Sequence, residues 1–125
     1  MRLVLDSGGL IAIERGDRAM WIRLKSALLA QSVPITHAGV LGQVWRGAPR
    51  QARLSQALAG IDVRPLDQDL GRLSGELLAA TRTSDVVDAA LALIAEDGDE
   101  ILTSDPDDIA ILVGAAERHV EIIRV

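Results

Sequence analysis

The sequence predicts an α/β fold in which helices cover a central, mostly parallel sheet. Short apolar segments alternate with longer segments whose apolar residues recur at helical spacing. A helix between successive strands requires a right-handed crossover and favours parallel pairing. The chain has 125 residues and no cysteine, which is enough for one hydrophobic core without disulfides or structural metals. We therefore expect a single domain spanning residues 1–125.

The first half of the chain is expected to contain two strands and four helices. Apolar runs predict strands at 2–5 and 33–36, with a turn at Ser7-Gly8-Gly9 after the first. Gly16 ends the first helix, Asp17 caps the second, and Gly47 and Pro49 separate the last two. The expected helices are 10–14, 17–30, 38–46 and 50–59.

The second half is expected to contain three strands and three helices. The segment 61–66 alternates apolar and polar residues, which favours a strand at the edge of the sheet. Asp67 is placed to cap a helix, and Glu96 to Asp99 form an acidic turn. The remaining expected strands are 100–103 and 119–125, and the expected helices are 67–80, 85–95 and 106–116.

Composition excludes several functional classes. A net charge of −5 argues against a protein that binds nucleic acid through bulk charge, and two tryptophans are too few for a base-stacking surface. The absence of cysteine excludes thiol catalysis and thiolate metal sites. No apolar run approaches the ~20 residues of a membrane span. The first residues become acidic too soon for a signal peptide. We expect a cytoplasmic protein with no membrane partner.

The pattern Ser-Asp-x-x-Asp occurs twice, at 84–88 and at 104–108, each time where a helix is expected to begin. The helix after the first copy is apolar on every side, so it is predicted to lie in the core. Asp88 is the only charge in that helix. A carboxylate in a core is costly unless a cation or hydrogen-bond donors compensate it, so Asp88 indicates a functional site.

Asp6 and Asp105 follow the first and fourth expected strands, and ligands of parallel sheets bind beyond the carboxyl ends of the strands. We expect these acids to meet Asp88 at one edge of the sheet. Gathered carboxylates repel one another unless a cation neutralises them, and oxygen ligands favour Mg²⁺ or Mn²⁺. The alternative is that the acids cap helices. That alternative is favoured for Asp85 and for 107–108, whereas for Asp6 capping and metal binding are equally favoured.

Three segments together resemble the PIN-domain family, and within it the VapC-type toxins of bacterial toxin–antitoxin pairs. They are Leu3-Val4-Leu5-Asp6-Ser7, Asp88-Ala89 and Ile101-Leu102-Thr103-Ser104-Asp105. The resemblance covers the whole chain and implies a three-layer α/β/α fold with about five short strands. It implies an endoribonuclease whose Asp6, Asp88 and Asp105 hold Mg²⁺ or Mn²⁺, with Asp85 as an alternative third acid or a supporting residue. It also implies an RNA substrate, a homodimer and a VapB-like antitoxin.

The chain departs from the PIN pattern at the second acid, because Gln43 stands where the family usually has a glutamate. An amide oxygen can orient metal-bound water, but it adds no charge and cannot act as a base. Glu14 lies eight residues after Asp6, ~10 Å along a helix, and is expected not to reach the site. Two functions stay open: an active nuclease, and a degenerate PIN domain that binds RNA or a protein without cleaving.

The remaining basic residues and one other fold also have to be interpreted. Arg46, Arg50 and Arg53 are close in sequence and form either a phosphate-guiding patch beside the site or an ordinary solvated face. His37 and His119 are isolated and are expected to be structural or surface residues. A flavodoxin-like or receiver-type module is an alternative to the PIN fold, because it also has an acid after its first strand. The absence of a lysine near the end of this chain argues against it.

Overall fold

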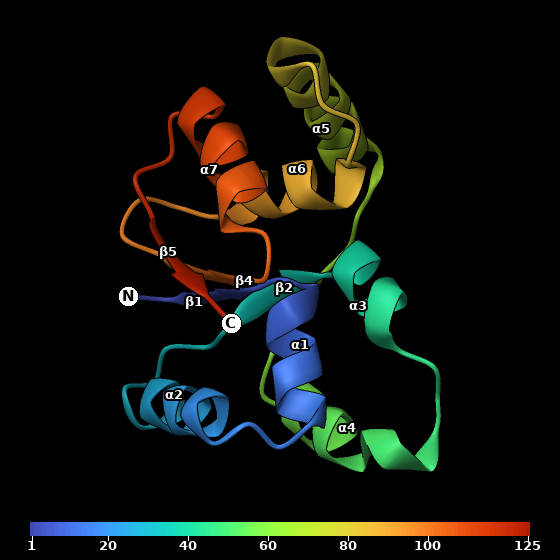
Figure 1. Ribbon diagram of the computed structural model, residues 1–125, viewed down its shortest axis with the longest axis vertical. Helices are drawn as coiled ribbons and strands as arrows, with labels where there is room; N and C mark the ends of the chain where they lie inside the picture. The colour runs from blue at the N-terminus through green and yellow to red at the C-terminus, as the bar shows by residue number, and fades with distance from the viewer.

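A computed structural model describes residues 1–125 and contains one five-stranded sheet whose strands are all parallel (Figure 1). The strand order is β3-β2-β1-β4-β5, so the first strand occupies the centre. The strands are β1 Leu3–Leu5, β2 Ile35–His37, β3 Asp62–Arg64, β4 Glu100–Thr103 and β5 Glu121–Arg124. The predicted α/β class and the five short strands are confirmed.

Seven α-helices and one short 3-10 helix connect the strands. In Figure 1, α1, α2 and α4 lie on one face of the sheet and α5, α6 and α7 on the other, while α3 lies beside the ends of the strands. The result is a three-layer α/β/α arrangement. The helices are α1 Ser7–Glu14, α2 Arg18–Leu29, α3 Ala38–Val44, η1 Pro49–Gln51, α4 Ala52–Leu58, α5 Gln68–Thr81, α6 Val86–Ile94 and α7 Pro106–Ala115.

The core lies on both faces of the central strands. Every residue of β1 is buried, and so are Ile101, Leu102 and Thr103 of β4. Helix α6 is buried from Asp88 to Ala92 and again at Ile94, as its all-round apolar sequence predicts. None of the helices combines the length and the apolar character that crossing a membrane requires.

The predicted turn at 7–9 is wrong, because α1 begins at Ser7 with Asp6 as its N-cap. Glycines are weak helix formers, but tertiary packing overrides that preference here. A Cβ at Gly8 would lie 3.0 Å from the backbone nitrogen and side chain of Ser104. The absence of a side chain at Gly8 thus lets the first turn of α1 approach the residue that follows β4.

The edge position of the third strand is confirmed, but only 62–64 pair, with β2, rather than 61–66. Asp62 and Arg64 form an exposed ion pair at 3.4 Å on this strand. The strand order excludes the receiver-type fold, in which the first strand lies beside the third. Here the third strand is at the edge, and β1 lies between β2 and β4.

Candidate functional site

The acids singled out in the sequence gather where the carboxyl ends of β1 and β4 lie side by side. β1 and β4 are paired neighbours, and the amide of Asp6 continues their ladder by donating to the Leu102 carbonyl at 3.0 Å. Asp6 directly follows β1, Asp105 precedes α7, and Asp88 stands in the first turn of α6. The parallel topology therefore brings the three remote acids to one edge of the sheet.

Asp6 is held in place through both of its carboxylate oxygens. Its Oδ1 accepts the amide of Ser7 at 2.7 Å, and its Oδ2 accepts the hydroxyl of Thr103 at 2.6 Å. The Thr103 Oγ1 in turn accepts the amide of Asp105 at 2.9 Å. Thr103 thus connects the first acid with the last. Sequence reasoning did not single out Thr103; its signal was a polar residue ending an otherwise apolar strand.

The Asp88 side chain is largely buried and has no partner in the protein, and its carboxylate oxygens keep contact with solvent, because no fully buried side-chain oxygen lacks a hydrogen bond. It is 8% exposed, it accepts no hydrogen bond from the protein, and no Arg, Lys or His forms an ion pair with it. The pKa of Asp88 is raised from its ordinary value of 3.8 to about 7. The largest cause is burial, and the negative charges of Asp6, Asp85, Asp105 and Asp108 contribute the rest. None of these five acids forms an ion pair with a cation of the protein.

Three of the acids near Asp88 play different local roles. Asp85 is exposed, and its Oδ1 caps α6 by accepting the amides of Val87 and Asp88 at 3.0 and 3.1 Å. Asp105 occupies the N-cap position of α7, but its side chain caps nothing. The helix-capping interpretation is thus confirmed for Asp85, and Asp6 caps α1 as well. It does not account for the side chains of Asp88 and Asp105.

Gln43 and Glu14 do not add a charge to this edge. Gln43 is exposed on α3. Glu14 is the last residue of α1, and its Oε1 accepts the side-chain amide of Gln51 at 2.6 Å. Gln51 is fully buried and also bonds the Val44 carbonyl at 2.8 Å. Glu14 is thus engaged by Gln51 at the opposite end of α1 from Asp6.

His37 connects the two helices that flank the acids. It is fully buried at the end of β2, and its Nδ1 accepts the amide of Gly39, which caps α3 at 3.1 Å. Its Nε2 lies 2.9 Å from the carbonyl of Val87. Because a carbonyl only accepts, Nε2 carries a proton. Nδ1 accepts an amide and so carries none, which makes the ring neutral. Burial lowers the pKa of His37, and the Val87 hydrogen bond and the charge of Asp6 oppose that change.

Of the arginines that follow α3, Arg46 binds α3 itself and Arg53 lies at the other end of α1 from the acids. The Arg46 guanidinium donates to the carbonyls of Gly42, Gln43 and Trp45 and so caps α3. Arg53 lies against Gly16, just beyond the end of α1. The eight residues of α1 separate that end from Asp6 by ~12 Å. Arg53 is therefore not beside the acidic edge, which contradicts, for this residue, the interpretation as a phosphate-guiding patch next to the site.

The donor set at the acidic edge suits a hard divalent cation. A buried carboxylate without a partner, surrounded by like charges, is the situation that Mg²⁺ or Mn²⁺ relieves. No three acidic or histidine side chains stand close enough together, as they are oriented, to hold a metal ion. Thr103 and Ser7 already fix the orientation of Asp6. The residues fit the ion in kind, and binding requires them to turn toward one another.

Comparisons with known proteins support the fold and go no further. No protein-family model matches the sequence, and no curated protein matches it. Among solved structures, the chain is similar to a chain in the crystal structure of VapBC2 from Rickettsia felis bound to a DNA fragment from their promoter. The TM-score is 0.69 at 16% sequence identity, over 98% of both chains. This likeness spans all three layers, and the fold of the present chain is PIN-like.

Proposed function

We propose that this protein is a Mg²⁺- or Mn²⁺-dependent endoribonuclease of the VapC toxin type. The main support is Asp88, whose side chain is only 8% exposed, has no partner in the protein and stands among other acids at the carboxyl edge of a parallel sheet. Asp6, Asp88 and Asp105 would hold the ion. Bound there, it would supply activation of water and stabilisation of charge on a phosphodiester.

The chain's own residues would prepare this edge for a phosphodiester. Thr103 fixes the orientation of Asp6, and His37 tethers the first turn of α6, which carries Asp88. Helix α3 presents the exposed side-chain amide of Gln43. This amide can donate a hydrogen bond to a phosphate oxygen, and it can donate to or accept from a water molecule. Asp85 would act through Asp88, by capping the helix that positions it.

A second candidate function is a degenerate PIN domain that binds RNA or a protein without cleaving. Gln43 favours it, because the amide leaves the site one negative charge short of the family pattern. The lack of a preassembled three-ligand cluster favours it too. The two functions differ in one measurable property: only the nuclease requires a divalent cation bound through Asp6 and Asp88.

Calorimetric titration with Mn²⁺, run in parallel with cleavage of a mixed RNA pool, tests the proposal. The wild type is expected to bind Mn²⁺ and to cleave, and Asp88→Asn is expected to lose both. Asp107→Asn, an exposed acid in the first turn of α7, is the matched control and should keep both. Binding without cleavage by the wild type would support the degenerate domain. A wild type that binds no Mn²⁺ would refute a metal site.

We further propose that a VapB-like antitoxin inserts an amphipathic segment into an apolar groove of about 510 Å³ between α2, the loop before β2 and the end of α4. Trp21, Leu28 and Val33 line it, and Leu28 and Val33 are 74% and 55% exposed. Exposed apolar surface of this kind is typical of an interaction site. Arg18 and Lys25 stand at its rim, which favours an apolar segment flanked by acidic residues.

Copurification tests this partner. A VapB-like antitoxin coexpressed with this protein should copurify with the wild type and be lost on Leu28→Glu, while Leu73→Glu, at an exposed position of α5, should retain it. Retention by Leu28→Glu would place the partner elsewhere. We also propose that the protein forms a homodimer. Its mass in analytical ultracentrifugation of the free chain, across a concentration series, tests this.

A further inference from the structure

Charge is segregated between the two helical layers. Residues 7–60 form α1 to α4 and carry seven Arg and Lys against two Asp and Glu, a net charge of +5. Residues 61–125 form β3 to β5 and α5 to α7 and carry five against fifteen, a net charge of −10. Because α1, α2 and α4 lie on one face of the sheet and α5 to α7 on the other (Figure 1), the acidic total conceals one basic face.

The cations of the basic face lack carboxylate partners. Of its seven Arg and Lys residues, only Arg23 forms an ion pair, with Glu100 at 3.6 Å. The nearby acid Glu14 is bound instead to the side-chain amide of Gln51. An ordinary solvated face of a protein of net charge −5 would be expected to mix both signs, so the unpaired cations call for an explanation.

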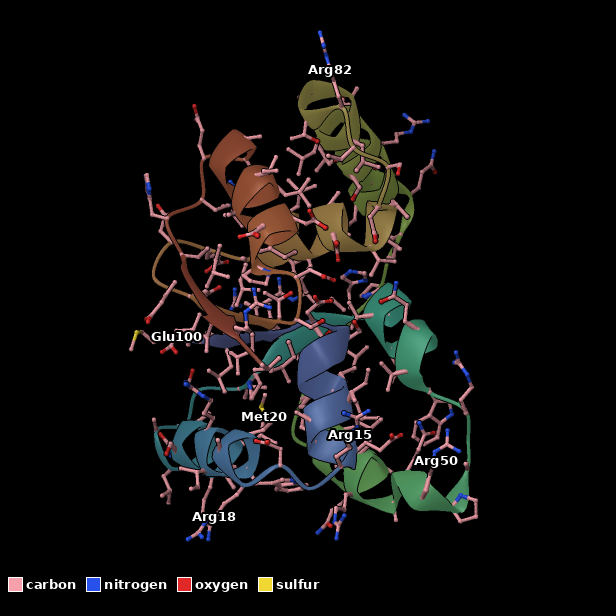
Figure 2. All side chains as sticks on the ribbon, in the orientation of Figure 1. Arg15, Arg18, Met20, Arg50, Arg82 and Glu100 are labelled. Atoms are coloured by element: carbon pink, nitrogen blue, oxygen red, sulfur yellow. The ribbon has the colours of Figure 1, made fainter.

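Three of these cations form the arginine cluster, which we define as Arg15, Arg50 and Arg53. Arg53 lies over Gly16, where an added Cβ would stand 3.0 Å from its Nη1, so it is beside Arg15 at the end of α1. Arg50 precedes Arg53 by about one helical turn. Figure 2 shows Arg15 and Arg50 below the sheet, near the end of α1 and the start of α4, while Arg82 points away from the opposite extreme of the molecule.

Helix capping explains only one member of the cluster. Arg15 is the C-cap of α1, where the helix dipole favours a cation. Arg50 and Arg53 stand at the beginning of the η1–α4 segment, where the dipole disfavours cations. All three side chains are exposed, and none pairs with an acid. Three exposed guanidinium groups near the end of α1 and the start of α4, none of them paired with an acid, are suited to bind phosphates.

We infer that the arginine cluster binds the phosphate backbone of single-stranded RNA and leads it along α1 to the acidic edge. This inference rests on the proposed nuclease function and adds the path of its substrate. The length of α1, ~12 Å, separates the cluster from Asp6, and a short extended stretch of RNA spans that distance. The segregation resolves a conflict: bulk charge repels RNA, while the basic face supplies a local attraction that the acidic layer does not cancel at physiological salt.

The test is fluorescence anisotropy of a labelled, unstructured RNA oligonucleotide, measured in EDTA over a series of NaCl concentrations. EDTA removes divalent cations, so binding is measured without cleavage. The cluster variant carries Arg15→Gln, Arg50→Gln and Arg53→Gln. The control carries Arg72→Gln, Arg82→Gln and Arg124→Gln, three exposed arginines of the acidic half, and changes net charge equally. A variant with three Arg→Lys changes in the cluster keeps its charge, and thermal unfolding checks that all variants fold.

The cluster variant is expected to lose about tenfold or more in affinity at low salt, and its slope of log K against log salt should fall by about 2 for three phosphate contacts. The control should stay within about twofold of the wild type, and the lysine variant should keep most of the affinity. Equal weakening by both glutamine variants would overturn the inference in favour of bulk charge. Displacement of RNA by an equal charge concentration of polyglutamate would overturn it in favour of an acidic protein.

Cleavage assays separate this inference from the nuclease proposal. If the wild type binds RNA through the cluster but never cleaves with Mn²⁺, the substrate path stands and the nuclease fails. If the cluster variant cleaves RNA as fast as the wild type at subsaturating substrate, the path fails and the nuclease stands.

Discussion

The hydroxyl of Thr103 donates a 2.6 Å hydrogen bond to Oδ2 of Asp6 across the two central strands of the sheet. Both side chains are buried, so the hydroxyl compensates part of the cost of placing a carboxylate there. We expect Thr103→Val to lower the free energy of unfolding by about 1.5–3 kcal/mol. Mn²⁺ affinity should fall as well, because Asp6 loses its fixed orientation. Thr103→Ser is the control and should retain both; urea unfolding and calorimetry measure them.

Asp88 is expected to make the protein less stable as the pH rises. Its pKa is about 7 in the folded chain and 3.8 ordinarily, so the folded state keeps a proton that the unfolded chain has released. Stability therefore falls between pH 4 and 7 and stays low above pH 7, by an amount on the order of 4 kcal/mol at most. Asp88→Asn should remove this dependence and unfold at a higher temperature at pH 8 without divalent cations. An unchanged pH profile in that variant would contradict the assignment.

Two substitutions separate the two functions of the His37 ring. An asparagine can accept the hydrogen bond of the Gly39 amide as Nδ1 does, but its side chain is too short to reach the Val87 carbonyl. A glutamine can donate a hydrogen bond to that carbonyl from the position of Nε2, but it no longer caps α3. We expect His37→Asn to speed hydrogen exchange in the first turn of α6, and His37→Gln to leave that turn protected and weaken α3. Exchange in α7 serves as the internal reference.

The pH dependence of His37 has the sign opposite to that of Asp88. Its pKa is lowered in the fold, so the stability that the neutral ring contributes is present above pH 6.5 and is lost as the pH falls below it. His37→Asn should remove that acid-induced loss. Urea unfolding of this variant and of Asp88→Asn at pH 5 and pH 8 distinguishes the two groups. A loss of stability in acid that persists in His37→Asn would assign it to another residue.

Gln43→Glu restores the acid of the PIN pattern and is expected to raise Mn²⁺-dependent RNA cleavage. The side chain is exposed, so stability should change by no more than about 0.5 kcal/mol. Gln68→Glu adds the same charge at the exposed start of α5 and should leave the cleavage rate unchanged. Equal rates for wild type and Gln43→Glu would show that position 43 does not line the site.

Gln51 is expected to be among the residues least tolerant of substitution. Its Oε1 accepts the amides of Arg46 and Gly47 at 2.8 and 3.1 Å, and its Nε2 donates to Val44 and Glu14. Gln51→Leu leaves all four groups without a partner and should cost about 2–4 kcal/mol. The exposed Gln56→Leu should be nearly neutral. Comparison of urea midpoints measures the difference, and equal midpoints would refute the network.

The acidic edge was predictable because it follows from local sequence and one topological rule. Asp6 and Asp105 come directly after apolar runs, and parallel strands end at the same edge. Asp88 was recognisable as a lone charge in an apolar helix. The roles of Thr103 and His37 were not predictable, because their partners lie 97 and 50 residues away in the chain. No local pattern specifies such contacts.

Local preference also misled in two places. Glycines after Asp6 favoured a turn, yet α1 begins there because close packing against Ser104 needs a residue without a side chain. Proximity in sequence made a phosphate-guiding patch beside the acids one of two interpretations of the arginines, but Arg53 of α4 lies against Gly16, beyond the far end of α1. The charge segregation was present in the sequence. It became meaningful only once the two halves proved to cover opposite faces of the sheet.

The packing of His37 on Gly39 has a consequence for how this sequence can vary. A Cβ at position 39 would stand 2.8 Å from Cε1 of the ring and 3.1 Å from Leu66, and the ring cannot move aside because both of its nitrogens are engaged. Alanine at 39 is therefore tolerated only with a smaller residue at 37. Positions 37 and 39 are therefore epistatic: whether a substitution at one raises or lowers stability depends on the residue at the other. Close relatives of this protein should show the two positions changing together.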